Sequence, residues 1–125
     1  MDTQEIVQAF EREFGGLATK FQVLELRGPD AETASDPRVA RPGVYVHWKD
    51  GVVFRVGRSL SNARKRALQH FPDNTGHSMA ALKDDRAAKL LLFTVEREDD
   101  CHWIAALKLF FERCLKPVIP PGRRG

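Results

Sequence analysis

A basic stretch near the middle of the chain, LSNARKRALQHF (60–71), carries side chains suited to binding phosphate. Asn62, Arg66 and His70 recur at intervals of four, which places them along one flank of a helix. An amide, a guanidinium and an imidazole aligned in this way can hold phosphate oxygens through charge-assisted hydrogen bonds. The alternative interpretation is a solvated, charged helix face without a ligand.

The preceding stretch, RPGVYVHWKDGVVFRVGRS (41–59), has the alternation of residues that is typical of a β-hairpin. Its turn can form in two ways. A two-residue Asp-Gly turn would pair Lys49 with Val52, whereas a three-residue turn ending on Gly51 would pair Trp48 with Val52. The two pairings differ by one residue, so they place opposite sets of side chains on each face of the sheet.

The distribution of apolar side chains favours the three-residue turn. In that register Tyr45 lies opposite Arg55, and His47 and Val53 share their face. The other face is wholly apolar and consists of Val44, Val46, Trp48, Val52, Phe54 and Val56. The two-residue turn would instead bury the Arg55 guanidinium among these apolar groups. His47 is either a general base or a surface histidine, and we interpret it as a surface histidine.

Around this hairpin the sequence predicts an α+β domain with a small antiparallel or mixed sheet of three or four strands, flanked by helices. The expected elements are a helix at 3–14, a strand at 20–26, a long surface loop at 27–42, a helix at 61–71, a loop at 72–78, a short helix at 79–86, a strand at 88–96 and a helix ending before Pro117. We expect one domain over residues 1–125, in which residues 118–125 form a basic tail that includes Arg123 and Arg124.

Composition restricts the class of protein. The 125 residues, 42% hydrophobic and 30% charged, suit one globular domain. No apolar run approaches the length of a membrane span, and the acidic, amphipathic N-terminal stretch is unlike a secretory signal, so we expect a cytoplasmic protein. Cys101 and Cys114 fit no metal-binding spacing; both are expected to be reduced, and Cys114 to be buried.

These motifs resemble those of the GIY-YIG nuclease family. In that family a GIY tripeptide opens the first hairpin strand, a YIG tripeptide closes the second, and a serine followed by Asn, Arg and His at intervals of four leads into the next helix. GVY (43–45) and RVG (55–57) stand at the two tripeptides here. The residues that match the helix are Ser59, Asn62, Arg66 and His70. The resemblance extends from about residue 42 to residue 117.

The resemblance implies a site for phosphodiester chemistry. In the family the first tyrosine lies near the attacking water, the helix arginine stabilises the phosphate, and a glutamate on a later helix binds a divalent cation, Mg²⁺ or Mn²⁺. The catalytic candidates are therefore Tyr45, Arg66, Arg55 and His70. The phosphate-binding candidates are Ser59, Asn62, Lys108 and Arg58.

The chain departs from the family pattern at two positions. Arg55 replaces the second tyrosine, and Lys108 stands where the metal-binding glutamate is expected. An ammonium group cannot bind a metal ion as a carboxylate does. Glu112, one helical turn further along, is the alternative metal ligand, or simply an ion-pair partner of Lys108.

We therefore expect Tyr45, Arg55, Arg66, His70 and Lys108 to converge on one electropositive site. The first hypothesis is a nuclease-like domain that binds nucleic acid, DNA rather than RNA, with weak or lost cleavage. The second is an active endonuclease that depends on a divalent metal. The third is a protein-interaction module on the same fold. No membrane contact is expected, and a protein partner could supply specificity.

Overall fold

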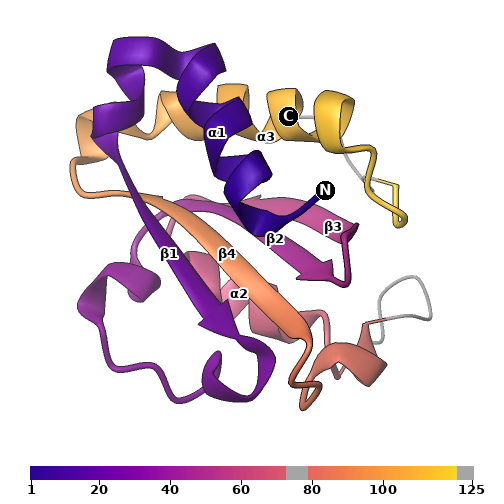
Figure 1. The fold of residues 1–125 in the computed structure, drawn as a ribbon. Helices are drawn as coiled ribbons and strands as arrows, with labels where there is room; N and C mark the ends of the chain where they lie inside the picture. The colour runs from indigo at the N-terminus through magenta and orange to yellow at the C-terminus, as the bar shows by residue number, and fades with distance from the viewer. Residues whose placement is uncertain (73–78, 121–125) are drawn as a thin grey trace.

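The computed structural model describes residues 1–72 and 79–120, and Figure 1 shows a sheet with helices on both sides. The strand order is β1-β4-β2-β3 and every neighbouring pair is antiparallel, so the predicted α+β class is confirmed. The strands are β1 (Phe21–Arg27), β2 (Gly43–Lys49), β3 (Val52–Ser59) and β4 (Ala88–Val95). The helices are α1 (Thr3–Phe14), α2 (Ala63–Gln69) and α3 (His102–Leu115).

Some expectations fall on residues outside these described ranges, namely most of the loop at 72–78 with His77, and Arg123 and Arg124 of the tail. The helix expected at 79–86 is only a short 3₁₀ helix, Ala80–Leu82, with one buried side chain to hold it. Within the described ranges, no helix has the length and apolar character needed to cross a membrane.

The sheet separates two apolar cores. On one face, which we call the α3 face, Ile6 and Phe10 of α1 and Leu107 of α3 pack against Val46 of β2. On the opposite face, which we call the α2 face, Ala67 of α2 packs against residues of β2 and β4. Figure 1 shows α1 and α3 together on one side of the sheet and α2 on the other.

The two central strands are covered on both faces. In β4 every residue from 90 to 95 is buried, and in β2 every residue from 43 to 47 is buried. Burial without alternation is typical of a strand that has a packed layer on each side. The polar side chains of β2 on the α2 face are consequently buried as well.

The hairpin has the two-residue turn, so the predicted three-residue turn is wrong. Asp50 and Gly51 both have positive φ, 49° and 82°, as a type I′ turn requires. Lys49 accordingly pairs with Val52. This Asp-Gly turn is favoured because its backbone twist matches that of the two strands.

A β-bulge in β3 makes this turn compatible with a buried, apolar face. Trp48 pairs with Val53 and His47 pairs with Arg55, so Phe54 is an extra residue without a partner on β2. The extra residue restores the alternation, and Arg55 shares a face with His47. Val53 joins the core of the α3 face, and Phe54 packs on the other side, which reverses the placement predicted for these two residues.

The segment at 27–42 was predicted to be a surface loop, but it packs over the α2 face. It contains two short 3₁₀ helices, Gly28–Asp30 and Pro37–Ala40. Ala31 and Val39 are both 1% exposed and belong to the core of the α2 face. Arg64 of α2 donates a hydrogen bond to the carbonyl of Ala34, which fastens the segment to that helix.

Helix α3 buries a stripe of four residues toward the sheet, Ile104, Leu107, Lys108 and Phe111. Cys114 lies off this stripe and is exposed, so the prediction of a buried thiol is wrong. Both cysteines are free.

The described residues that follow α3 are attached to the edge of the sheet and do not form a free tail. The amide of Val118 donates to the carbonyl of Val53 at 3.0 Å, and the amide of Ile119 donates to the carbonyl of Phe54 at 2.9 Å. Ile119 is buried in a third apolar cluster, beside the end of α2. Residues 116–119, which we call the C-terminal strap, therefore cover part of the edge of β3 and connect the two faces.

Candidate phosphate-binding site

Tyr45 is held against Gly57 on the α2 face. The two residues pair across β2 and β3, and a Cβ atom at Gly57 would lie 2.2 Å from both Cζ and the hydroxyl oxygen of Tyr45. Contacts this short do not occur between real Cβ atoms and their neighbours. The glycine in the RVG tripeptide therefore makes room for the phenol.

Tyr45, His70 and Arg55 form a hydrogen-bonded cluster. The Tyr45 hydroxyl lies 2.7 Å from Nε2 of His70, and Nε of Arg55 donates to the same nitrogen at 3.2 Å. A guanidinium group can only donate, so this nitrogen must carry a lone pair and the phenol must donate to it. His70 is then a neutral imidazole with its proton on Nδ1, placed to accept the proton of Tyr45.

This cluster is shielded from solvent. Tyr45 is 1% exposed and His70 is 3% exposed. Burial raises the pKa of Tyr45, while the positive charges of Arg55 and Arg66 act in the opposite direction. The phenol is therefore protonated at neutral pH, and its oxygen does not meet solvent in this conformation.

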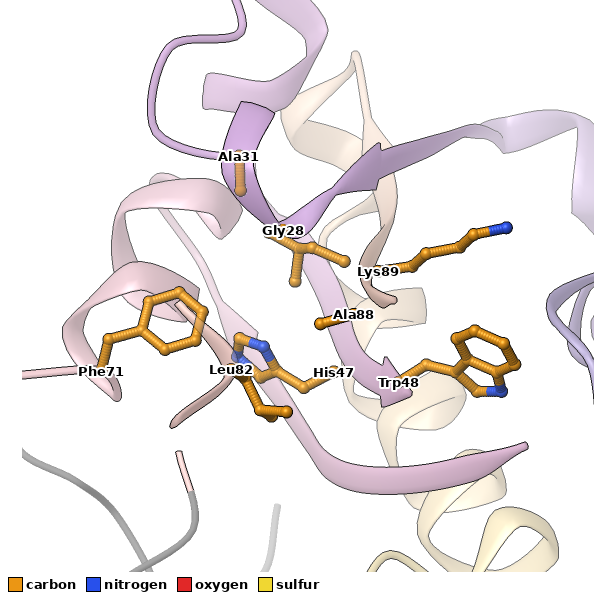
Figure 2. Close-up of a pocket in the computed structure, with 9 residues that line it drawn as sticks. Gly28, Ala31, His47, Trp48, Phe71, Leu82, Ala88 and Lys89 are labelled. Carbon is orange, nitrogen blue, oxygen red and sulfur yellow. The ribbon is translucent and has the colours of Figure 1, made fainter. Parts of the chain in front are cut away.

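His47 is buried beside the cluster, so its interpretation as a surface histidine is wrong. Its ring centroid lies 5.7 Å from that of Tyr45 and 5.3 Å from that of Phe71, and Figure 2 shows the ring close to Leu82. Burial lowers the pKa of His47 to about 3, and the positive charge of Arg55 acts in the same direction. An imidazole with so low a pKa is a weak base, which also argues against the general-base alternative.

An open polar hollow of ≈ 280 Å³ lies at the start of α2. Its lining residues are Ser59, Ser61, Asn62, Lys65, Arg66 and Gln69. Lys65 and Arg66 are exposed, and Nη1 of Arg66 donates to Oε1 of Gln69 at 2.9 Å. The positive charge of Arg66 also opposes the rise in the pKa of Tyr45. This arginine of the hollow therefore interacts electrostatically with the buried cluster.

Ser59 and Asn62 have a structural role at the start of α2. Oδ1 of Asn62 accepts a hydrogen bond from the amide of Lys65 at 3.0 Å, as an N-cap residue does. Oγ of Ser59 accepts from the amides of Ser61 and Asn62, at 3.2 and 3.0 Å. The side-chain NH₂ group of Asn62 still has hydrogens to donate in the hollow, whereas the Ser59 hydroxyl lies 3.3 Å from Oγ of Ser61.

Within residues 1–72 and 79–120, no ion pair joins Arg55, Lys65 or Arg66 to a carboxylate. Each ion pair recorded within the described residues uses another cation: Lys20, Arg27, Arg38, Lys49, Lys89, Arg97 or Lys108. Arg55 donates to an imidazole and Arg66 to an amide, which leaves both positive charges uncompensated. An anion from outside the chain would find a complementary surface here.

Lys108 does not belong to this site. It is 7% exposed on the sheet-facing stripe of α3, where it forms an ion pair with Glu112. Arg58 is also on the α3 face, because it pairs with Val44. The predicted convergence of Lys108 with Tyr45 is therefore wrong, since α3 packs on the opposite side of the sheet.

The residues around Tyr45 do not fit Mg²⁺ or Mn²⁺. In the part of the chain that the structure describes, no group of three or more His, Cys, Asp and Glu residues could hold a metal ion. Glu112, the alternative metal ligand, lies on the α3 face beside Lys108. The charges that act on Tyr45 are those of Arg55 and Arg66, which would repel a divalent cation.

Comparisons with models of protein families, with curated proteins and with solved structures found no match. The resemblance to GIY-YIG nucleases therefore stays a hypothesis that depends on the GVY and RVG tripeptides and on the residues at intervals of four that follow them.

Proposed function

We propose that this chain is a GIY-YIG nuclease-like domain that binds the phosphate backbone of nucleic acid and cleaves it weakly or not at all. The phosphates would bind in the hollow at the start of α2, where Lys65 and Arg66 are exposed. Arg55 would add positive charge from the adjacent strand. The observation that carries the proposal is that these three cations lack carboxylate partners, whereas seven other cations of the described residues have one.

Two features argue against efficient cleavage. The phenol that resembles the catalytic tyrosine of the family is 1% exposed, so a scissile phosphate cannot approach it without a rearrangement. Among the described residues, no cluster of three or more His, Cys, Asp and Glu side chains is available to hold a metal ion beside Tyr45. A metal-dependent step would need both an opening of the cluster and ligands from elsewhere.

A salt-dependent binding assay tests the proposal. Fluorescence anisotropy would measure the affinity for a labelled DNA duplex, and for an RNA duplex of the same sequence, at several salt concentrations. Binding should weaken steeply with salt, because phosphate contacts release counterions. Arg66→Ala should lower the affinity by about fivefold and the salt slope by about one.

Arg12→Ala is the matched control, because Arg12 is exposed on α1, on the far side of the sheet. It removes the same charge from the molecule and should leave affinity nearly unchanged. Equal effects of the two substitutions, or binding that ignores salt, would contradict the proposal. Tighter binding of the DNA duplex would support DNA as the ligand.

The hydrogen bond between Tyr45 and His70 favours one second candidate, an active endonuclease. In that case His70 would accept the phenol proton while Arg55 stabilises the phenolate. Incubation of labelled DNA with the protein, with Mg²⁺ or Mn²⁺ and with EDTA, would separate the two functions. Cleavage that disappears in Tyr45→Phe would replace the binding proposal with the enzyme.

The proposal places the domain in the cytoplasm, where free thiols such as Cys101 and Cys114 stay reduced. It also leaves room for a protein partner that supplies specificity, because backbone contacts carry no sequence information themselves. Fractionation of cells that express a tagged chain would test the location. A purification of the tagged chain under native conditions would show whether one partner protein accompanies it in fixed proportion.

A further inference from the structure

A small cavity lies behind the Tyr45–His70 cluster, between β2 and the start of β4. Its volume is ≈ 10 Å³, which is about the space that one water molecule needs. Figure 2 shows His47 in its wall, with Phe71 and Leu82 on one side and Gly28 above. The cavity is separate from the hollow of the proposed phosphate site, because the two share no lining residue.

One wall of the cavity offers a nitrogen that lacks a partner. His47 is 2% exposed, and its Nε2 atom has no hydrogen-bond partner. The backbone of Ala67 acts on the ring as a hydrogen-bond acceptor would, and Nε2 has no partner, so the ring proton is assigned to Nδ1. With the proton on Nδ1, Nε2 presents a lone pair. A buried acceptor of this kind is costly unless a donor reaches it.

On the opposite side, the backbone carbonyl of Leu82 belongs to a lining residue. Its oxygen lies close to Gly28, because a Cβ atom there would be 3.2 Å from it. This oxygen accepts one hydrogen bond, from the amide of Asp85. A carbonyl oxygen can accept two, so it has capacity left.

We propose that a single buried water molecule binds in this cavity and donates one hydrogen to Nε2 of His47 and the other to the carbonyl oxygen of Leu82, which both belong to lining residues. These two groups are acceptors, so a ligand that joins them must donate twice. A cavity of this volume has no room for a larger donor. Water satisfies both conditions.

The water would join β2 to the segment that leads into β4. The ring of His47 also meets that of His70 edge to face, with centroids 6.0 Å apart, so the same water would hold the wall against which the cluster packs. Buried waters of this type are ordered and exchange slowly compared with surface waters. The inference does not depend on nucleic-acid binding and would survive its failure.

Crystallography of the full chain, at a resolution that shows ordered water, is the first test. We expect a density peak about 2.7 to 3.2 Å from Nε2 of His47 and within hydrogen-bond distance of the carbonyl oxygen of Leu82. Density with no peak there, or a side chain bonded to Nε2 instead, would overturn the proposal. The unsubstituted protein is sufficient for this measurement.

NMR in solution gives an independent test. The carbon-bound ring protons of His47 should show cross-relaxation with water of the sign expected for a long-lived bound molecule, and the ¹⁵N shift of Nε2 should be that of a hydrogen-bonded acceptor. His102, which is exposed, is the internal control and should show only fast-exchanging water. When the methyl protons of Leu82, another lining residue, are observed, His47→Phe should abolish the long-lived water signal, while Arg12→Ala should retain it. Persistence of the signal in His47→Phe, or its lack in the unsubstituted protein, would contradict the proposal.

Discussion

Positively charged side chains have different kinds of partner on the two faces of the sheet. On the α3 face the chain neutralises its own buried cation, because Lys108 lies beside Glu112 at 7% exposure. On the α2 face, Arg55 and Arg66 contact an imidazole and an amide rather than a carboxylate. The first arrangement is complete without a ligand, and the second is complementary to an anion. A count of basic residues along the sequence does not reveal this difference, whereas the pairing of each one does.

The largest effect is expected from breaking the pair on the α3 face. Lys108→Met removes the ammonium beside the Glu112 carboxylate, whose side chain is 10% exposed. We expect the free energy of unfolding to fall by about 3 kcal/mol, as when one partner of a buried ion pair is removed. Urea titration followed by circular dichroism would measure it.

The double variant Lys108→Met with Glu112→Leu is the control for that prediction. It removes both charges and should recover most of the lost stability. Neither variant should change the affinity for nucleic acid, because the pair lies across the sheet from the hollow. A loss of affinity in the stable double variant would show that the two faces are not independent.

On the α2 face the largest effect should come from Gly57→Ala. The added methyl group would overlap the Tyr45 ring, so the phenol must leave its place beside His70. We expect a loss of about 2 kcal/mol, as for other overpacked cores. Thermal unfolding measures the loss, and the Tyr45 fluorescence or ring NMR signals report the displacement.

Gly16→Ala is the matched control, because a Cβ atom there has no neighbour within 4 Å. Its stability should stay within about 0.5 kcal/mol of that of the unsubstituted protein. If Gly57→Ala proved equally harmless, the close contact between Tyr45 and β3 would be disproved.

Acid should lower the free energy of unfolding, because His47 is buried on the α2 face with a lowered pKa. Its pKa is 6.5 when unperturbed and about 3 in the folded protein, so between these values the unfolded chain binds a proton that the folded chain does not. Stability is therefore full above pH 6.5 and falls as the pH drops toward 3, by up to about 1.4 kcal/mol per pH unit. Urea titrations between pH 7 and pH 4.5 would measure the slope.

His47→Phe removes this titration and should flatten the profile over the same range. His102→Phe is the matched control, because His102 is exposed and its loss should leave the slope as it was. Tyr45, His70 and Arg55 surround His47, and none of them adds a carboxylate that could hold the extra proton. An unchanged slope in His47→Phe would mean that another group causes the acid sensitivity.

The smallest effect concerns Asn62 in the hollow. Asn62→Ala removes the N-cap of α2 and should cost about 1 kcal/mol of stability. Asn62→Asp keeps an oxygen at the cap but adds a negative charge beside Lys65 and Arg66, so stability should hold while affinity for nucleic acid falls. Unchanged affinity in Asn62→Asp would remove the hollow as the phosphate site.

The sequence is sufficient to predict the hairpin, the apolar strand at 88–96, which is observed at 88–95, and an α+β class with three or four strands, because each depends on local periodicity. The predicted turn is wrong because both of its registers lack an extra residue within β3. Asp-Gly is a strong signal for a two-residue turn, and its conflict with the alternation in β3 was itself evidence for an extra residue. A bulge at Phe54 resolves that conflict.

The burial of His47 is related to the apolar run at 90–95. The run from Leu90 to Val95 is apolar on both faces, which indicates a strand with packed layers on each side. β2 pairs with this strand inside the sheet, between β4 and β3, so its polar residue His47 is buried. The edge strand β1 pairs with the same strand but is exposed at Val23 and Glu25.

The position of Lys108 had no such signal. Helical periodicity shows which side of α3 faces the sheet but not which face of the sheet the helix covers. The contact between Arg55 and His70 is part of the convergence expected from the sequence, and the structure contains it. Its geometry joins β3 to the end of α2, and the periodicity within either element does not show that geometry.

The C-terminal strap has a practical meaning for anyone who defines the boundaries of this domain. Motif matching alone would end the unit at Pro117, two residues before Ile119 enters the interior. A fragment cut there would lack two backbone hydrogen bonds to the edge of β3 and would open the apolar cluster on the side away from α3. An expression fragment intended to fold should therefore continue through residue 120.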